Sequence, residues 1–168
     1  DVRDMKVTKD FLQKIFTKYP NFCVDGVNPA RPGKDSKDEV EKYQQEMLES
    51  AGSIWAEIEK AAEWLNRFPK GYTFNRQYHS YSLKHVYAEV ITHQKEGKGD
   101  GYLCNGDFIL AGLLAGFDIK EYNVGSGDVY FNITGLKQDY RDSGVYRKVD
   151  KNGVVVFYRN FSRLAQTT

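Results

Sequence analysis

Cysteine is scarce in this sequence. The 168 residues include two cysteines, Cys23 and Cys104, which lie far apart and form no CxxC pair. This spacing argues against a disulfide-stabilised scaffold and against a cysteine zinc site, so we expect a reducing, cytoplasmic (intracellular) setting and no cofactor. Long apolar runs are also lacking, because the longest, Phe108 to Phe117, contains two glycines and is too short to cross a bilayer.

A large excess of charge of one sign is absent as well. The formal net charge is +1 at pH 7. Residues 1–68 contain 11 Lys and Arg against 13 Asp and Glu, whereas residues 69–168 contain 13 against 10. The second part is therefore mildly basic, but it has no basic stripe of the kind found in proteins that coat DNA.

Aromatic residues, in contrast, are abundant. Hydrophobic residues make up 40% of the chain, and tyrosine occurs 12 times. This composition argues against a disordered chain, and the length fits one domain with a real core. Because tyrosine combines a large ring with a polar hydroxyl, we expect the tyrosines at the edge of the core or on a surface that meets a partner.

Apolar residues at helical spacing predict helices over 7–19, 36–68 and 80–94. Thr8 and Ser36 are the expected N-caps of the first two helices, and Glu39 completes a capping box with Ser36. The helix over 36–68 is acidic in its first half and amphipathic in its second. Gly52 marks an expected break between the two halves.

A fourth helix follows Asn105, which is its expected N-cap, and Gly116 stands where a C′ glycine belongs. The intervening sequence FILAGLLAG is apolar on every side, so this helix should be buried. We therefore expect it to serve as the scaffold of the molecule and not as a surface helix.

Strands are expected in the C-terminal third. Alternating residues over 117–123 and 129–134 predict a hairpin, and 145–149 is expected to pair with 154–158. The predicted fold is α+β, with four or so helices in the N-terminal two-thirds packed on a small antiparallel sheet from the C-terminal third. We expect a single domain over 1–168, comprising an N-terminal helix and loop (1–35), a long acidic helix (36–68), a central helix–helix–hairpin unit (72–134) and a basic aromatic hairpin (136–163).

Three segments of the central unit are distinctive: SYSLKHVYAE at 80–89, NGDFILAGLLAGF at 105–117 and VYFNIT at 129–134. Together they resemble a pattern found in small proteins of phages, plasmids and other bacterial mobile elements, which reads SYxLKHxxE, then NGxFIxA, then GF and a short strand. The resemblance covers about 55 residues and is interrupted by the glycine-rich insertion 95–101. It implies a viral or mobile-element context and no particular activity.

Cations and aromatic rings are mixed in two places, before and along the helix over 80–94 and in the hairpin over 136–163. Such mixtures suit contact with phosphates and stacked bases, although a solvated helix face and a charged edge hairpin would look the same. The candidate contact residues are Arg76, Tyr78, Tyr81, Lys84, His85, Arg141, Arg147, Lys148 and Arg159.

Two alternatives would make the protein an enzyme. Cys104 precedes a helix N-terminus, which could lower the pKa of its thiol, and His85 or His79 could act as its base. Asp118 and Lys120 form an acid-x-Lys pattern on a predicted strand, as in nucleases that bind Mg²⁺. That second alternative needs a further acid, for which Glu89, Asp100 and Asp107 are the candidates.

The helix over 80–94 also offers a possible zinc site. His85, Glu89 and His93 share one helix face. However, His85 and His93 are separated by about 12 Å of helical rise, which one ion cannot bridge. We therefore assign no metal ligands.

The sequence thus favours a non-enzymatic binding protein, an accessory or inhibitory protein of a virus or mobile element. Its expected partner is nucleic acid or a nucleic-acid-processing complex, with no membrane contact. The alternative is a protein–protein interaction module that uses the acidic helix over 36–51. Oligomeric state, the choice between DNA and RNA, and the native N-terminus stay open.

Overall fold

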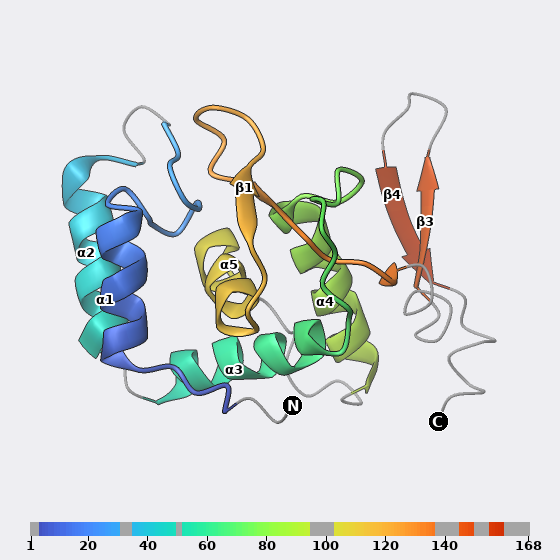
Figure 1. Cartoon of the computed structure of the whole chain (residues 1–168), viewed down its shortest axis with the longest axis horizontal. Helices are drawn as coiled ribbons and strands as arrows, with labels where there is room; N and C mark the ends of the chain where they lie inside the picture. The colour runs from blue at the N-terminus through green and yellow to red at the C-terminus, as the bar shows by residue number, and fades with distance from the viewer. Residues whose placement is uncertain are drawn as a thin grey trace.

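The fold was determined as a computed structural model, which describes residues 4–30, 35–49, 52–94, 103–136, 145–149 and 155–159, without the side chains of 90, 92–94 and the last two ranges. Within these ranges the helices precede the strands along the chain, and the class is α+β, as predicted (Figure 1). The elements are α1 (Lys9–Lys18), α2 (Lys37–Glu49), α3 (Ser53–Asn66), α4 (Ser80–Gln94), α5 (Asn105–Leu114), β1 (Ile119–Glu121), β2 (Val129–Phe131), β3 (Val145–Val149) and β4 (Val155–Arg159).

The helix starts follow the capping residues read from the sequence. Thr8 Oγ1 accepts a hydrogen bond from the Phe11 N–H at 3.1 Å, and Ser36 Oγ accepts one from the Glu39 N–H at 3.3 Å. The expected break at Gly52 is present, since α2 ends at Glu49 and α3 begins at Ser53. Gly52 has a φ of 141°, a backbone conformation that other residues rarely adopt. α2 and α3 are therefore separate helices, and Figure 1 shows α3 running below the others.

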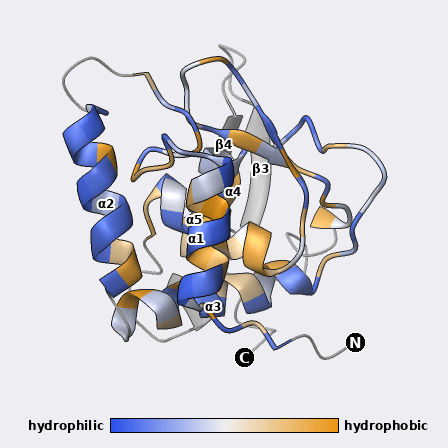
Figure 2. Cartoon of the chain, turned by 60° about the vertical axis from the view of Figure 1, so that its left-hand side comes forward, coloured by the Kyte–Doolittle hydropathy of each residue, from blue (hydrophilic) through white to orange (hydrophobic). Residues whose placement is uncertain are grey.

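The interior of the molecule is built around α5. Its residues Phe108, Ile109, Leu110 and Ala111 have no solvent exposure, which confirms that the uniformly apolar helix is buried. α5 packs against α3 and α4, and Figure 1 shows it between α1 and α2 on one side and α4 on the other. By contrast, Figure 2 shows α2 at the edge of the molecule with a mostly hydrophilic outer face.

Both predicted hairpins are present. β1 and β2 are antiparallel, with Lys120 opposite Tyr130, and the turn lies between them as expected. β3 and β4 form a second two-stranded antiparallel sheet with Arg147 opposite Phe157. The backbone of β3 lies beside α4 (Figure 1). Among the described residues, no helix has both the length and the apolar character needed to cross a bilayer.

One capping prediction is wrong by one residue. The N-cap of α5 is Cys104, whose Sγ accepts a hydrogen bond from the Asp107 N–H at 3.4 Å. Asn105, the predicted cap, is instead the first residue of the helix. Its side chain donates to the carbonyl of Asp25 and to the carboxylate of Asp128, both at 2.9 Å. The Asn105 side chain therefore bonds to distant residues and not to the backbone of its own helix. The sequence alone does not reveal these partners.

Candidate functional site

The start of α4 is anchored to β2, and this anchor fixes which side chains reach the surface. Ser80 is buried, and its Oγ accepts a hydrogen bond from the Val129 N–H at 3.1 Å. The His79 backbone forms an isolated bridge with Tyr130, and His79 Nδ1 accepts a hydrogen bond from the Ser82 N–H at 3.4 Å. The ring of His79 therefore caps α4 in the way that serine or aspartate commonly does.

Three aromatic rings are in contact beside this cap. The Tyr122 ring lies 4.8 Å from the His79 ring and 5.2 Å from the Tyr130 ring, measured between centroids. The first pair is inclined by 37° and the second by 88°, both common geometries for favourable ring contacts. Tyr122 is 38% exposed, so part of its ring is accessible to solvent.

A second ring cluster lies on the first turns of α4. Tyr81 is 49% exposed, and its ring centroid lies 4.6 Å from that of His85, edge to face. Lys84 Nζ lies 4.8 Å from the Tyr81 centroid, a cation–π contact. We call the two clusters together, comprising His79, Tyr81, Lys84, His85, Tyr122 and Tyr130, the α4 aromatic surface.

Two titratable side chains of this surface, Lys84 and His85, have shifted pKa values. Burial lowers the pKa of Lys84, while Cys104 and Asp128 act in the opposite direction. Partial burial, followed by the positive charge of Lys84, lowers the pKa of His85, and Glu89 opposes this shift. The lowered pKa favours the neutral imidazole of His85, which can stack and exchange hydrogen bonds.

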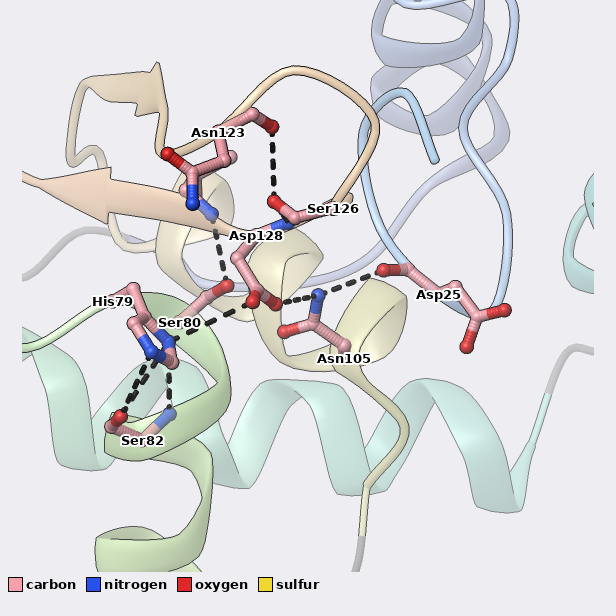
Figure 3. A network of polar contacts seen from close by, with 9 residues as sticks. Asp25, His79, Ser80, Ser82, Asn105, Asn123, Ser126 and Asp128 are labelled. Atoms are coloured by element: carbon pink, nitrogen blue, oxygen red, sulfur yellow. Dashed lines mark hydrogen bonds and ion pairs between the residues drawn. The ribbon is translucent and has the colours of Figure 1, made fainter. Parts of the chain in front are cut away.

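A polar network holds the α4 start, the β1–β2 turn and the α5 start together (Figure 3). Asp128 is its centre: Oδ1 accepts from Asn105 at 2.9 Å, and Oδ2 lies 3.8 Å from His79 Nδ1. The Asp128 N–H donates to Ser126 Oγ at 3.2 Å. Asn105 extends the network to Asp25, 80 residues away in the chain. The network thus places the His79 ring beside the β1–β2 turn.

The structure divides the nine candidate contact residues into three groups. Arg76, Tyr81 and His85 are exposed, in agreement with a contact role. Tyr78 is buried in the core, and Lys84 is only 4% exposed, so neither presents its full side chain to a partner. Burial of Tyr78 follows from its place just before Ser80, where the chain enters the interior.

The remaining candidates belong to the C-terminal hairpin. Arg147 and Lys148 lie on β3, and Arg159 lies on β4, while their side chains are outside the described part of the structure. Arg141 lies outside the described residues altogether.

Sequence reasoning did not include Tyr122, Tyr130 and His79 among the contact residues. The alternation over 117–123 was a usable signal, because it places tyrosine on the polar side of a strand.

The expectation that a helix N-terminus lowers the pKa of Cys104 is wrong. Burial and the neighbouring Asp107 carboxylate raise the pKa of this thiol strongly, and the backbone N–H groups offset only part of the effect. The sulfur is already used as the N-cap acceptor of α5. An unreactive, protonated thiol is the state that this environment favours.

The predicted nuclease carboxylate has a local role. The Asp118 N–H donates to Asn132 Oδ1 at 2.8 Å, and Asn132 Nδ2 donates to Asp118 Oδ2 at 3.5 Å. Asp107, a candidate second acid, accepts from the Tyr43 hydroxyl at 2.7 Å. Within the described ranges, which leave out Asp100 and the side chain of His93, no three His, Cys, Asp or Glu side chains come together as metal ligands.

Comparisons with known proteins give no further assignment. No protein-family model, no curated protein and no solved structure matches this chain.

Proposed function

We propose that this protein is a non-enzymatic nucleic-acid-binding protein, and that the α4 aromatic surface is where it contacts single-stranded nucleic acid or an exposed strand in a nucleic-acid-processing complex. The observation that carries the proposal is the pair of solvent-open tyrosines, Tyr81 and Tyr122, each held against a histidine ring at the start of α4. Exposed rings with cations alongside them are the stacking platforms that proteins offer to unpaired bases.

Rigidity supports this proposal. A stacking ring is effective when it is held in place before the base arrives, since less side-chain freedom is lost on binding. Tyr122 contacts two rings, and the His79 ring accepts a hydrogen bond from the Ser82 N–H. The Tyr81 ring contacts both Lys84 and His85, one turn further along the same helix. The tyrosine rings are therefore preorganised for stacking against bases.

Positively charged side chains near the α4 aromatic surface also support the proposal. Arg76 is exposed just before α4, and Lys120 is exposed on β1 next to Tyr122. The basic strands β3 and β4 lie on the α4 side of the molecule (Figure 1). We infer that these cations track the phosphates while the tyrosines stack on bases. A viral or mobile-element accessory or inhibitory role is the context that the sequence resemblance suggests for such an activity.

The test is fluorescence anisotropy with labelled single-stranded DNA and RNA of about 12 nucleotides, a length in the usual range of such sites. Binding should weaken steeply between about 50 and 200 mM salt, because phosphate contacts release counterions. Tyr81→Ala and Tyr122→Ala should each weaken binding about fivefold or more, the loss expected for one stacked base.

Tyr19→Ala is the matched control. Tyr19 also carries a lysine over its ring, with Lys18 Nζ at 5.5 Å from the centroid, but it lies at the end of α1, on the other side of α5 from α4 (Figure 1). Its removal should leave the affinity unchanged. Absence of binding at every salt concentration, or equal losses for all three variants, would contradict the proposal.

A second candidate function rests on α2. Five of its carboxylates are exposed: Asp38, Glu39, Glu41, Glu46 and Glu49. Val40 and Met47 provide its buried side. A helix of this kind fits a protein-interaction module with a basic partner. A partner that co-purifies with the chain after nuclease treatment, and is lost on changing these five residues to glutamine or asparagine, would favour this function over the first.

A further inference from the structure

A pocket of about 410 Å³ opens at the side of the molecule remote from β3 and β4, a volume in the range of small-ligand sites. It is formed where α2, the start of α3 and the start of α5 meet the loop that follows α1. Its lining residues are Val24, Tyr43, Glu46, Met47, Ile54, Leu103, Cys104 and Asp107. Neither the proposed nucleic-acid contact nor the polar network uses this space.

An apolar wall is formed by four of the eight lining residues, namely Val24, Met47, Ile54 and Leu103. Val24 and Ile54 are each 41% exposed, whereas Met47 and Leu103 are buried. A ligand with a hydrocarbon chain would remove apolar surface from water on both the exposed and the buried parts of this wall.

The polar part of the pocket is acidic. Asp107 lies at the start of α5, and its Oδ1 accepts the Tyr43 hydroxyl at 2.7 Å. Burial raises the pKa of Asp107, while the hydrogen bonds from Tyr43 and Cys104 lower it. Glu46 adds an exposed carboxylate from α2. The eight lining residues include these two carboxylates and no lysine, arginine or histidine.

These features distinguish among ligand classes. An anion would meet two carboxylates and be repelled. A neutral hydrocarbon would cover Asp107 without compensating its charge, which is unfavourable for a carboxylate taken out of water. A cation on a flexible aliphatic chain satisfies both parts of the pocket, because the chain lies on the apolar wall and the cation meets the carboxylate.

We propose that this pocket binds a primary alkylammonium group, with the nitrogen at Asp107 and the hydrocarbon chain along Val24, Ile54 and Leu103. The ammonium supplies three donors to carboxylate oxygens, and both a lysine side chain and a free alkylamine present this group on a hydrocarbon chain. The proposal is independent of the nucleic-acid function, since the two surfaces share no residue.

The experiment is a calorimetric or NMR titration of the intact chain with hexylammonium chloride, hexanol and hexanoate. Hexylammonium should bind about tenfold more tightly than hexanol, as expected for one charge-assisted hydrogen-bonded contact. Hexanoate should not bind. Equal affinities for hexylammonium and hexanol, or tighter binding of hexanoate, would overturn the proposal.

Variants locate the site. Asp107→Asn should reduce hexylammonium binding about tenfold while leaving hexanol binding unchanged, whereas Asp38→Asn, an exposed carboxylate of α2 outside the pocket, should change neither. If Asp107→Asn does not fold, Ile54→Trp serves instead, because it fills the pocket from a half-exposed position and should abolish binding of both ligands. Unaltered binding in Ile54→Trp would contradict the assignment.

A final comparison separates the two sources of the amine. Nα-acetyl-lysine methylamide presents the same ammonium on a backbone. Binding of this compound at least as tightly as hexylammonium would identify a lysine side chain of a partner protein as the ligand. Binding of hexylammonium alone would identify a free amine. Binding of neither would overturn the proposal, and Tyr81→Ala should leave all these affinities unchanged.

Discussion

Two helices of this protein begin in the same way but in different surroundings. At α4, His79 Nδ1 accepts the Ser82 N–H at 3.4 Å, and at α5, Cys104 Sγ accepts the Asp107 N–H at the same distance. The first turn of α4 presents Tyr81 to solvent, whereas Asn105 and Gly106 in the first turn of α5 are buried. The type of N-cap therefore does not determine whether the first turn of a helix is buried or exposed to solvent.

The difference lies in what surrounds each start. Gly106 donates its N–H to the carbonyl of Val24 at 3.0 Å, so the chain after α1 passes directly over α5. Nothing in the described part of the structure covers Tyr81 in this way, and its contacts come from its own helix. The start of α5 is a structural junction, and the start of α4 is an open surface. The following predictions test that contrast.

The largest effect is expected at Gly106. A Cβ there would lie 2.1 Å from the carbonyl oxygen of Cys23, which belongs to the backbone and cannot turn aside. Gly106→Ala should therefore destabilise the fold by about 3 kcal/mol, although alanine is the better helix former. Gly71→Ala is the control, because the nearest atom to its Cβ is the methyl group of the exposed Thr134 at 2.9 Å, while the nearest backbone oxygens lie at 3.7 Å. Urea unfolding of both variants checks this, and similar losses would remove the contrast.

A smaller loss is expected from Asn105→Ala. This change removes hydrogen bonds to Asp25 and Asp128 and leaves the Asp128 carboxylate without one of its donors. The expected loss is about 2 kcal/mol of unfolding free energy. Asn21→Ala removes an exposed side-chain hydrogen bond to Asn28 and should cost no more than about 0.5 kcal/mol. An equal cost for the two would show that the α5 junction contributes nothing special.

The shifted pKa of Asp107 predicts the direction in which stability changes with pH. Because burial raises its pKa above the ordinary value of 3.8, the folded chain holds this proton at pH values where the unfolded chain has lost it. The stability from this group is therefore present at low pH and is lost as pH rises through the raised pKa. Relative to Asp107→Asn, the parent protein should be less stable at pH 7 than at pH 4.

Tyr43→Phe sharpens this test. The Tyr43 hydroxyl is a donor that lowers the pKa of Asp107, so removing it should enlarge the pH dependence. Unfolding free energies measured from pH 4 to 7 for the three proteins provide the comparison. Parallel curves would contradict the assigned environment of Asp107.

The smallest effect on stability is expected at the open surface. Tyr81→Ala removes a half-exposed ring and one cation–π contact with Lys84. The expected loss is about 0.5 kcal/mol, measured by the same urea unfolding. A loss as large as that of Gly106→Ala would mean that Tyr81 is part of the scaffold and not of a contact surface.

Local signals in the sequence predicted most of the backbone. Thr8 and Ser36 marked two helix starts, Gly52 marked the break between α2 and α3, and the uniformly apolar run after Asn105 marked the buried helix. The capping and glycine signals act through neighbours within four residues, and the apolar run indicates burial whichever segments cover it. Such features are readable because the chain brings the partners together by itself.

What could not be predicted depends on distant segments. Asn105 is not a cap because Asp25 and Asp128 bind its side chain. Cys104 is not activated because Asp107 and burial oppose the effect of the helix. The proposed amine pocket joins residues from Val24 to Asp107, and no periodicity in the sequence connects them.

The most direct test of the account is an NMR titration of isotopically labelled protein with single-stranded DNA or RNA of about 12 nucleotides, followed at every backbone amide. Amide shifts should change most over residues 76–85, around Lys120 to Asn123 and at Tyr130, while α5 and the residues of the amine pocket stay unchanged. Changes concentrated at Val24, Tyr43 and Asp107, or an unchanged spectrum at low salt, would contradict the claim that the open start of α4 is the surface that meets nucleic acid.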